Sequence, residues 1–168
     1  MNTWIVSDTH FGHKNMLSFK RKDGKPLRDF SSGDEMDQHM IKCWNSVVDP
    51  EDKVYHLGDV GFTNFTYTKR VFDFLHGDKV LVKGNHDNFK LSQYSQIFRD
   101  VRAYHVLDKI LLAHIPVHPD SLNRWRGQVH GHTHSNSLTD PRYYNASVEV
   151  TDYTPVNFND IRKYYEAL

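Results

Sequence analysis

The chain has 168 residues, enough for one domain with its own hydrophobic core, and we expect a single domain over residues 1–168. Hydrophobic residues make up 38% and charged residues 25%, which excludes a disordered chain, and Lys+Arg and Asp+Glu are equal at 21 each, so the basic excess typical of nucleic-acid or anionic-membrane binding is absent. The lone Cys43 excludes an internal disulfide, and no apolar run has the length of a signal peptide or membrane span, so we expect a cytoplasmic protein.

Short apolar runs alternate with amphipathic stretches in the first half of the chain. They predict strands at residues 4–7, 53–57 and 79–83 and helices at 36–47 and 67–75. Asp34 is the candidate cap of the first helix. Residues 19–30 are basic and contain the turn pair Asp23-Gly24, which predicts an exposed loop or hairpin.

The second half is richer in predicted strands. The expected elements are a short helix at 91–98, strands at 101–107, 110–113 and 128–130, an extended stretch at 143–150 and a terminal helix at 160–168. Asp108-Lys109 is a tight turn, and residues 115–127, with two prolines, form a loop. This order predicts an α/β fold of two packed sheets with helices outside.

Histidine is unusually frequent, with 12 residues, and several of these histidines follow predicted strands directly. Five such places carry metal-ligand side chains: Asp8-Thr9-His10, Gly58-Asp59, Gly84-Asn85-His86-Asp87, His114 and Gly131-His132-Thr133-His134. Strand ends lie close together in a sheet, so these side chains can converge. A set of imidazole, carboxylate and amide ligands suits manganese, iron, cobalt or zinc better than calcium.

In order and content, these five motifs resemble the calcineurin-like metallophosphoesterase superfamily. The match runs from Asp8 to His134. The further residues Phe11-Gly12-His13, Trp44-Asn45 and His56-Leu57 make the chain similar to the small stand-alone bacterial and phage members. The resemblance implies a four-layer α/β/β/α sandwich of two mixed sheets flanked by helices, with the metal site at strand ends.

The resemblance also implies two divalent metal ions, manganese first, with iron, zinc, cobalt, nickel or magnesium as alternatives. One ion would be held by Asp8, His10, Asp59 and His134, and the other by Asp59, Asn85, His114 and His132, with Asp59 bridging the two. A hydroxide between the ions would attack phosphorus in line. His86 would act as general acid or orient the phosphate, and Asp87 would hold the His86 imidazole.

The substrate side of the site is less defined by sequence. His13 is a candidate substrate-binding residue because it follows the first ligand motif. Arg124 and Arg126 are candidates because a guanidinium pairs well with phosphate oxygens. Lys20, Arg21, Lys22, Lys25 and Arg28 fit a solvated loop better than an arm that grips a phosphate backbone.

The expected partner is a small phosphorylated, nucleotide-like molecule, with nucleic acid not favoured and no membrane. Gly58-Asp59-Val60-Gly61 lacks the Asp-Arg-Gly continuation of the protein phosphatases, which disfavours a phosphoprotein. Two alternatives stay open: a catalytically retired scaffold that binds a protein, and a nuclease.

Overall fold

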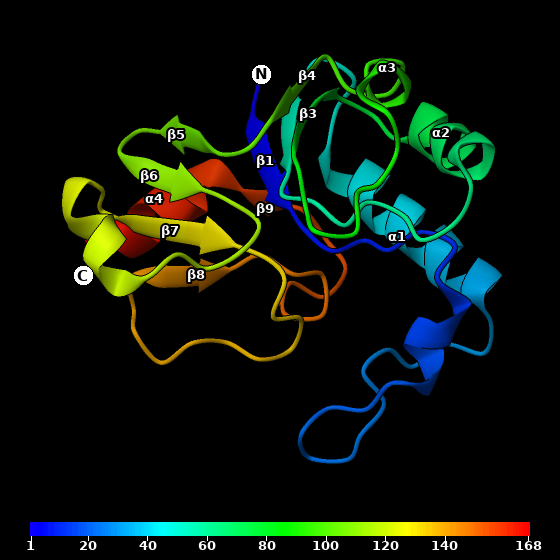
Figure 1. Cartoon of the computed structure of the whole chain (residues 1–168), viewed down its shortest axis with the longest axis horizontal. Coiled ribbons are helices and arrows are strands. Elements are labelled where there is room, and N and C mark those ends of the chain that lie inside the picture. The colour runs from blue at the N-terminus through cyan, green and yellow to red at the C-terminus, as the bar shows by residue number, and fades with distance from the viewer.

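The computed structural model describes all 168 residues. The protein consists of two mixed β-sheets flanked by helices (Figure 1). The five-stranded sheet has the order β4-β3-β2-β1-β9, in which β1 to β4 are parallel and β9 is antiparallel to β1. The four-stranded sheet has the order β5-β6-β7-β8, with only β5 antiparallel to its neighbour. The expected α/β class with two mixed sheets is confirmed.

The elements in chain order are β1 (Thr3–Val6), the 3-10 helix η1 (Lys14–Ser18), α1 (Gly33–Val47), β2 (Lys53–His56), α2 (Phe65–Phe74), β3 (Asp78–Val82), α3 (Leu91–Tyr94) and β4 (Asp100–Arg102). They continue with β5 (His105–Leu107), β6 (Ile110–Leu112), the 3-10 helix η2 (Pro119–Arg124), β7 (Gly127–His130), β8 (Tyr143–Asn145), β9 (Val156–Asn157) and α4 (Phe158–Glu166). None of these helices is both long and apolar enough to cross a membrane.

Alternating side chains of the first sheet divide the core in two. On one face, Val6, Val54 and Leu81 pack in a cluster with α1 and α2, including Trp44 and Phe72. The opposite face lies against the second sheet, and its apolar side chains pack with those of β6, β7 and α4. The buried members of this cluster are Ile5, Tyr55, Leu57, Val80, Val82, Ile110, Leu112, Val129, Ala146, Phe158, Ile161 and Tyr165. The sheets are therefore held together by a continuous apolar layer.

The outer face of the second sheet has a thinner cover than the first. Leu111, Ala113 and Tyr143 form a small cluster with Leu122 of η2, and Trp125 packs at its border. The 3-10 helix η2 and a loop thus cover the outer face of this sheet, as α1 and α2 cover the outer face of the first sheet.

Two expected elements differ in the structure. The strand expected at 101–107 is divided into β4, which pairs with β3, and β5, which pairs with β6, so the chain crosses between sheets at Ala103 and Tyr104. The helix α1 is capped by Ser32, whose hydroxyl accepts from the Glu35 backbone N–H, and not by Asp34. The turn at Asp108 and Lys109 is confirmed, with φ of 49° and 61° as a type I′ hairpin requires.

The segment 19–30 forms the expected hairpin, with a bridge between Lys20 and Pro26, and extends away from the body of the protein (Figure 1). Its end does not fit the expectation of a solvated loop, because Leu27 and Arg28 turn inward and are buried.

The topology brings the ligand motifs together. Asp8, Asp59 and Asn85 follow the carboxyl ends of the parallel strands β1, β2 and β3, and His114 and His132 follow those of the parallel strands β6 and β7. Because each sheet presents these ends at one edge, five loops distant in sequence meet between the two sheets.

Candidate metal centre

Backbone hydrogen bonds join the ligand loops directly. The N–H of Asp8 donates to the Gly58 carbonyl and the N–H of His10 to the Asp59 carbonyl, each at 3.0 Å. Two glycines make the close approach possible: a Cβ at Gly84 would overlap the Asp59 carboxylate, and a Cβ at Gly131 would overlap the side chains of Ser7 and Asp8. The loops therefore form one fixed frame.

Five candidate ligands have left-handed backbones, which non-glycine residues seldom adopt. They are Asp8 (φ 59°), His10 (48°), Asp59 (55°), His132 (68°) and His134 (50°). Each such conformation costs roughly 1–3 kcal/mol and persists only where its surroundings enforce it. Concentrated backbone strain of this kind is characteristic of functional sites.

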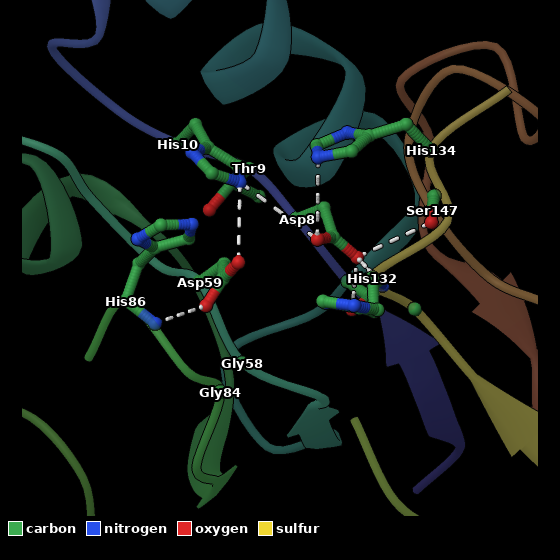
Figure 2. A network of polar contacts seen from close by, with 12 residues as sticks. Asp8, Thr9, His10, Gly58, Asp59, Gly84, His86, His132, His134 and Ser147 are labelled. Carbon is green, nitrogen blue, oxygen red and sulfur yellow. Dashed lines mark hydrogen bonds and ion pairs between the residues drawn. The ribbon is translucent and has the colours of Figure 1, made fainter. Parts of the chain in front are cut away.

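Asp8 presents one oxygen to the protein and the other to the site. Its Oδ2 accepts from the Ser7 hydroxyl (2.6 Å), the Ser147 hydroxyl (3.2 Å) and the His132 backbone N–H (2.9 Å). Its Oδ1 is buried without a hydrogen-bond partner, and so is Nε2 of His10, 3.7 Å away (Figure 2). Two unsatisfied buried ligand atoms facing one another are what a cation site leaves in the protein.

Asp59 lies between the two groups of histidines. Its Oδ1 accepts from the His86 backbone N–H at 2.9 Å (Figure 2). Its Oδ2 is 3.5 Å from His10 Nε2 on one side and 3.4 Å from His114 Nε2 on the other. A single carboxylate oxygen thus faces both candidate cation positions.

The remaining ligands of the second position also face one another. Asn85 Oδ1 lies 2.9 Å from His114 Nε2 and 3.0 Å from His132 Nδ1. Nδ1 of His114 donates to the Leu57 carbonyl at 2.7 Å, which orients Nε2 toward the site as the atom that would bind a metal ion once it loses its proton. That tautomer is the one a metal-binding imidazole needs.

The electrostatics favour positive charge at the centre. Burial acts against ionisation of Asp8 and Asp59, but the neighbouring histidines outweigh it and hold the pKa of both carboxyls well below their usual range. Burial likewise acts against protonation of His10 and His114, yet the carboxylates raise the pKa of both imidazoles. Such a site attracts cations, protons or metal ions, and its oxygen and nitrogen donors fit borderline divalent metals.

Buried carboxylates and imidazoles form two compact candidate groups, Asp8 with His10 and His134, and Asp8 with Asp59 and His114. All seven residues expected to bind metal therefore lie at one place. Asn85 and His132 complete the second group through the contacts described above.

The structure adds two supporting residues: Glu149, which the sequence pattern did not single out, and Arg28, which it assigned to a solvated loop. His134 donates from Nδ1 to Glu149 Oε1 at 2.9 Å, which turns its Nε2 toward Asp8. Arg28 pairs with the same carboxylate and donates to the backbone carbonyls of Asp8 and Thr9. The guanidinium therefore joins the first ligand loop to the carboxylate that orients His134.

Asp87 has a different role from the expected one. Its carboxylate accepts from the backbone N–H groups of Gly84 (2.7 Å), Asp59 (2.8 Å) and Val60 (3.0 Å), and not from the His86 imidazole. Burial raises the pKa of Asp87 in spite of these three donors. Asp87 therefore holds the second ligand loop against the third.

His86 and His13 lie at the open side of the centre. The His86 ring is exposed, with its centroid 6.0 Å from that of His10. His13 Nδ1 is 3.3 Å from His10 Nδ1, and its ring stacks on Phe62 at 4.0 Å. Burial and the nearby His10 lower the pKa of His13 to about 4, so this imidazole is neutral near pH 7.

Arg124 and Arg126 are not brought to this site. Both precede β7, whereas His132 and His134 follow it, so the strand separates them from the ligands. Arg126 instead lies 4.0 Å from Glu166 at the other end of the molecule, and its N–H donates to the Lys109 carbonyl. Their expected contact with a phosphate has no support in this geometry.

Comparisons with known proteins identify the family and several relatives of this chain. Residues 1–147 match the profile of the calcineurin-like phosphoesterase superfamily domain. An uncharacterised protein of Methanocaldococcus jannaschii is 34% identical over 97% of this chain and 90% of its own length, and the gene 66 protein of Mycobacterium phage L5 is 25% identical over 89% and 85%. The crystal structure of a protein of unknown function from Aquifex aeolicus superposes with a TM-score of 0.75 at 27% identity, covering 96% of this chain and 98% of that one.

Proposed function

The chain belongs to the calcineurin-like phosphoesterase superfamily, and we propose that it is a binuclear metal-dependent hydrolase that cleaves phosphoester bonds in small nucleotide-like substrates. The observation that carries the proposal is the position of Asp59 Oδ2, about equally distant from His10 Nε2 and His114 Nε2. Two cations roughly 3.5–4 Å apart repel each other, so they need a shared anionic ligand. Manganese fits the mixed oxygen and nitrogen donors.

Divalent cations bound there would supply Lewis-acid chemistry to the attacking water and to the phosphoryl oxygens. The protein contributes orientation and a proton. Asp8 and Asp59 are fixed by hydrogen bonds to their second oxygens, so the phosphate meets a preorganised site. The His86 imidazole, exposed beside His10, donates a proton to the leaving-group oxygen.

The test is hydrolysis of bis-p-nitrophenyl phosphate with added manganese. The wild-type protein should turn over the diester, and Asp59→Asn should reduce the rate to the uncatalysed background. Asp73→Asn is the matched control, because Asp73 is exposed on α2 and pairs only with Lys69. A wild-type protein that hydrolyses no phosphoester and does not hold two metal ions after purification would instead support the retired scaffold.

A nuclease is the second candidate, supported by the basic hairpin. Lys20, Lys22 and Lys25 are exposed on a segment that extends from the body, and Phe19 at its base contacts His13 at the site. A phosphate backbone entering the site could lie along these charges. Replacing Lys20, Arg21 and Lys22 by Gln should then weaken single-stranded DNA cleavage and leave bis-p-nitrophenyl phosphate turnover intact. Equal losses on both substrates would contradict a nucleic-acid contact.

A further inference from the structure

An aromatic cavity adjoins the candidate centre on the side of His86. It has a volume of about 290 Å³ and is lined by Gly61, Phe62, Thr63, His86, Asn88 and Phe89. All of these residues belong to the two loops that continue from Asp59 and Asn85. A larger cavity of about 690 Å³ lies among β8, β9 and α4 and includes no candidate catalytic group.

The two phenyl rings of the cavity are held in place from outside it. Phe62 stacks on His13 with an interplanar angle of 16°, and its backbone N–H donates to the Phe11 carbonyl. Phe89 contacts Phe65 and Tyr94 edge to face or tilted, at 5.7 and 5.5 Å. Phe62 is nonetheless 45% exposed, which is unusual for a ring so firmly supported. Fixed aromatic rings that face solvent are suited to stack on a planar ligand.

The same cavity has free polar groups. Neither the Thr63 hydroxyl nor the Asn88 amide makes a hydrogen bond within the protein, although hydrogen bonds occupy most polar side chains in the ligand loops around them. Small-molecule sites usually combine aromatic side chains with a few donors and acceptors, as this cavity does, and its volume is near the lower end of the range for such sites, about 300 Å³. A single heterocycle fits these properties better than an aliphatic or purely phenyl group, which would leave Thr63 and Asn88 unpaired.

We infer that this cavity binds the base of a nucleotide substrate, stacked on Phe62 and Phe89, with Asn88 and Thr63 at the base edge. This inference rests on the proposed function, since His86 lines the cavity and also faces the candidate centre, so a base bound here would place its phosphoester toward the metal ligands. A base site here narrows the proposed substrates from small nucleotide-like phosphoesters to nucleotides and nucleoside diesters.

The kinetic test compares two diesters with the same leaving group, thymidine 5′-(p-nitrophenyl phosphate) and methyl p-nitrophenyl phosphate. In Phe62→Leu, the ratio of kcat/KM for the nucleoside diester to that for the methyl diester should fall about 5- to 150-fold, the worth of one base–aromatic stack. Phe74→Leu, an exposed phenyl ring on α2 outside the site, should leave the ratio unchanged. An unchanged ratio in Phe62→Leu would overturn the inference.

A binding measurement separates this inference from the proposed function. Saturation-transfer NMR with adenosine 5′-monophosphate should show strong transfer to the adenine protons in the wild-type protein and little in Phe62→Leu, whether or not any ester is hydrolysed. Such transfer without phosphoesterase activity would reject the proposed function and keep the cavity as a base site. Two outcomes would reject the base site alone. One is turnover of small diesters without saturation transfer to the adenine protons, and the other is phenyl phosphate competing for the cavity as well as adenosine 5′-monophosphate does.

Discussion

Arg28 and Glu149, 121 positions apart in the sequence, form a fully buried ion pair with Nη2 and Oε1 at 2.9 Å. The pair lies behind the first ligand loop, because Arg28 also donates to the carbonyls of Asp8 and Thr9, and Glu149 also accepts from His134. A buried pair of this kind adds little net stability, but loss of one partner leaves the other charge without compensation.

The variant Glu149→Gln should therefore lower the free energy of unfolding by about 3–5 kcal/mol in urea denaturation. It should also weaken manganese binding roughly 10- to 100-fold, since His134 loses the carboxylate that orients it. Glu166→Gln is the control, because Glu166 is half exposed and lies 3.9 Å or more from its arginine partners. Equal effects of the two substitutions would contradict a role for the buried pair.

Asp87→Asn tests whether Asp87 holds the loops or the His86 ring. The substitution removes the charge and one acceptor from three backbone N–H donors, so we expect a loss of about 2–4 kcal/mol in unfolding free energy. Both circular dichroism melting and urea titration measure this. A variant with wild-type stability and an altered pH–rate profile alone would instead support contact with the imidazole.

His56 makes stability depend on pH. Gly58 donates to His56 Nδ1, so the ring proton is on Nε2 and is directed at the Thr9 hydroxyl. Complete burial, only partly offset by Asp8 and Asp59, lowers the pKa of His56 to about 3. Above pH 6.5 the ring is neutral in both folded and unfolded chains; between pH 6.5 and 3 only the unfolded chain takes up a proton, so stability declines as pH falls.

In His56→Asn, the loss of unfolding free energy between pH 7 and pH 5 should be smaller than in the wild type by about 2 kcal/mol. Urea titrations at the two pH values give this difference. His118→Asn, at an exposed histidine outside the centre, is the matched control substitution. Parallel pH profiles for wild type and His56→Asn would show that His56 is not the titrating group.

Manganese binding should weaken steeply as pH falls through the neutral range. The raised pKa values of His10 and His114 mean that the metal-free protein holds protons there, which manganese must displace. If both are displaced, the dissociation constant should increase about 100-fold per pH unit below these pKa values, as linkage requires. Calorimetric titration from pH 8 to 5.5 measures the slope, and an affinity independent of pH would contradict histidine ligation.

The sequence predicts where the candidate ligand side chains gather because most of them directly follow a recognisable apolar strand. Asp8, Asp59 and Asn85 take their positions from the parallel order of β1, β2 and β3, which local pattern and topology determine together. Arg28 and Glu149 could not be recognised in this way. Their role depends on contacts between residues far apart in sequence, and a basic residue near the end of a polar hairpin has the local pattern of a solvated one.

The local sequence pattern likewise does not predict the interruption between β4 and β5. Residues 101–107 are continuously compatible with a strand, and only the pairing of β4 with one sheet and β5 with the other divides them. Arg124 and Arg126 show a second limit of prediction from sequence. They are close to His132 in the sequence but lie at the opposite end of β7.

Anomalous diffraction from crystals soaked in manganese tests most directly whether two cations share the Asp59 carboxylate. We predict two peaks roughly 3.5–4 Å apart, one beside Asp8, His10 and His134 and the other beside Asn85, His114 and His132, with Asp59 between them. A single peak, or peaks that do not contact Asp59, would contradict the binuclear centre.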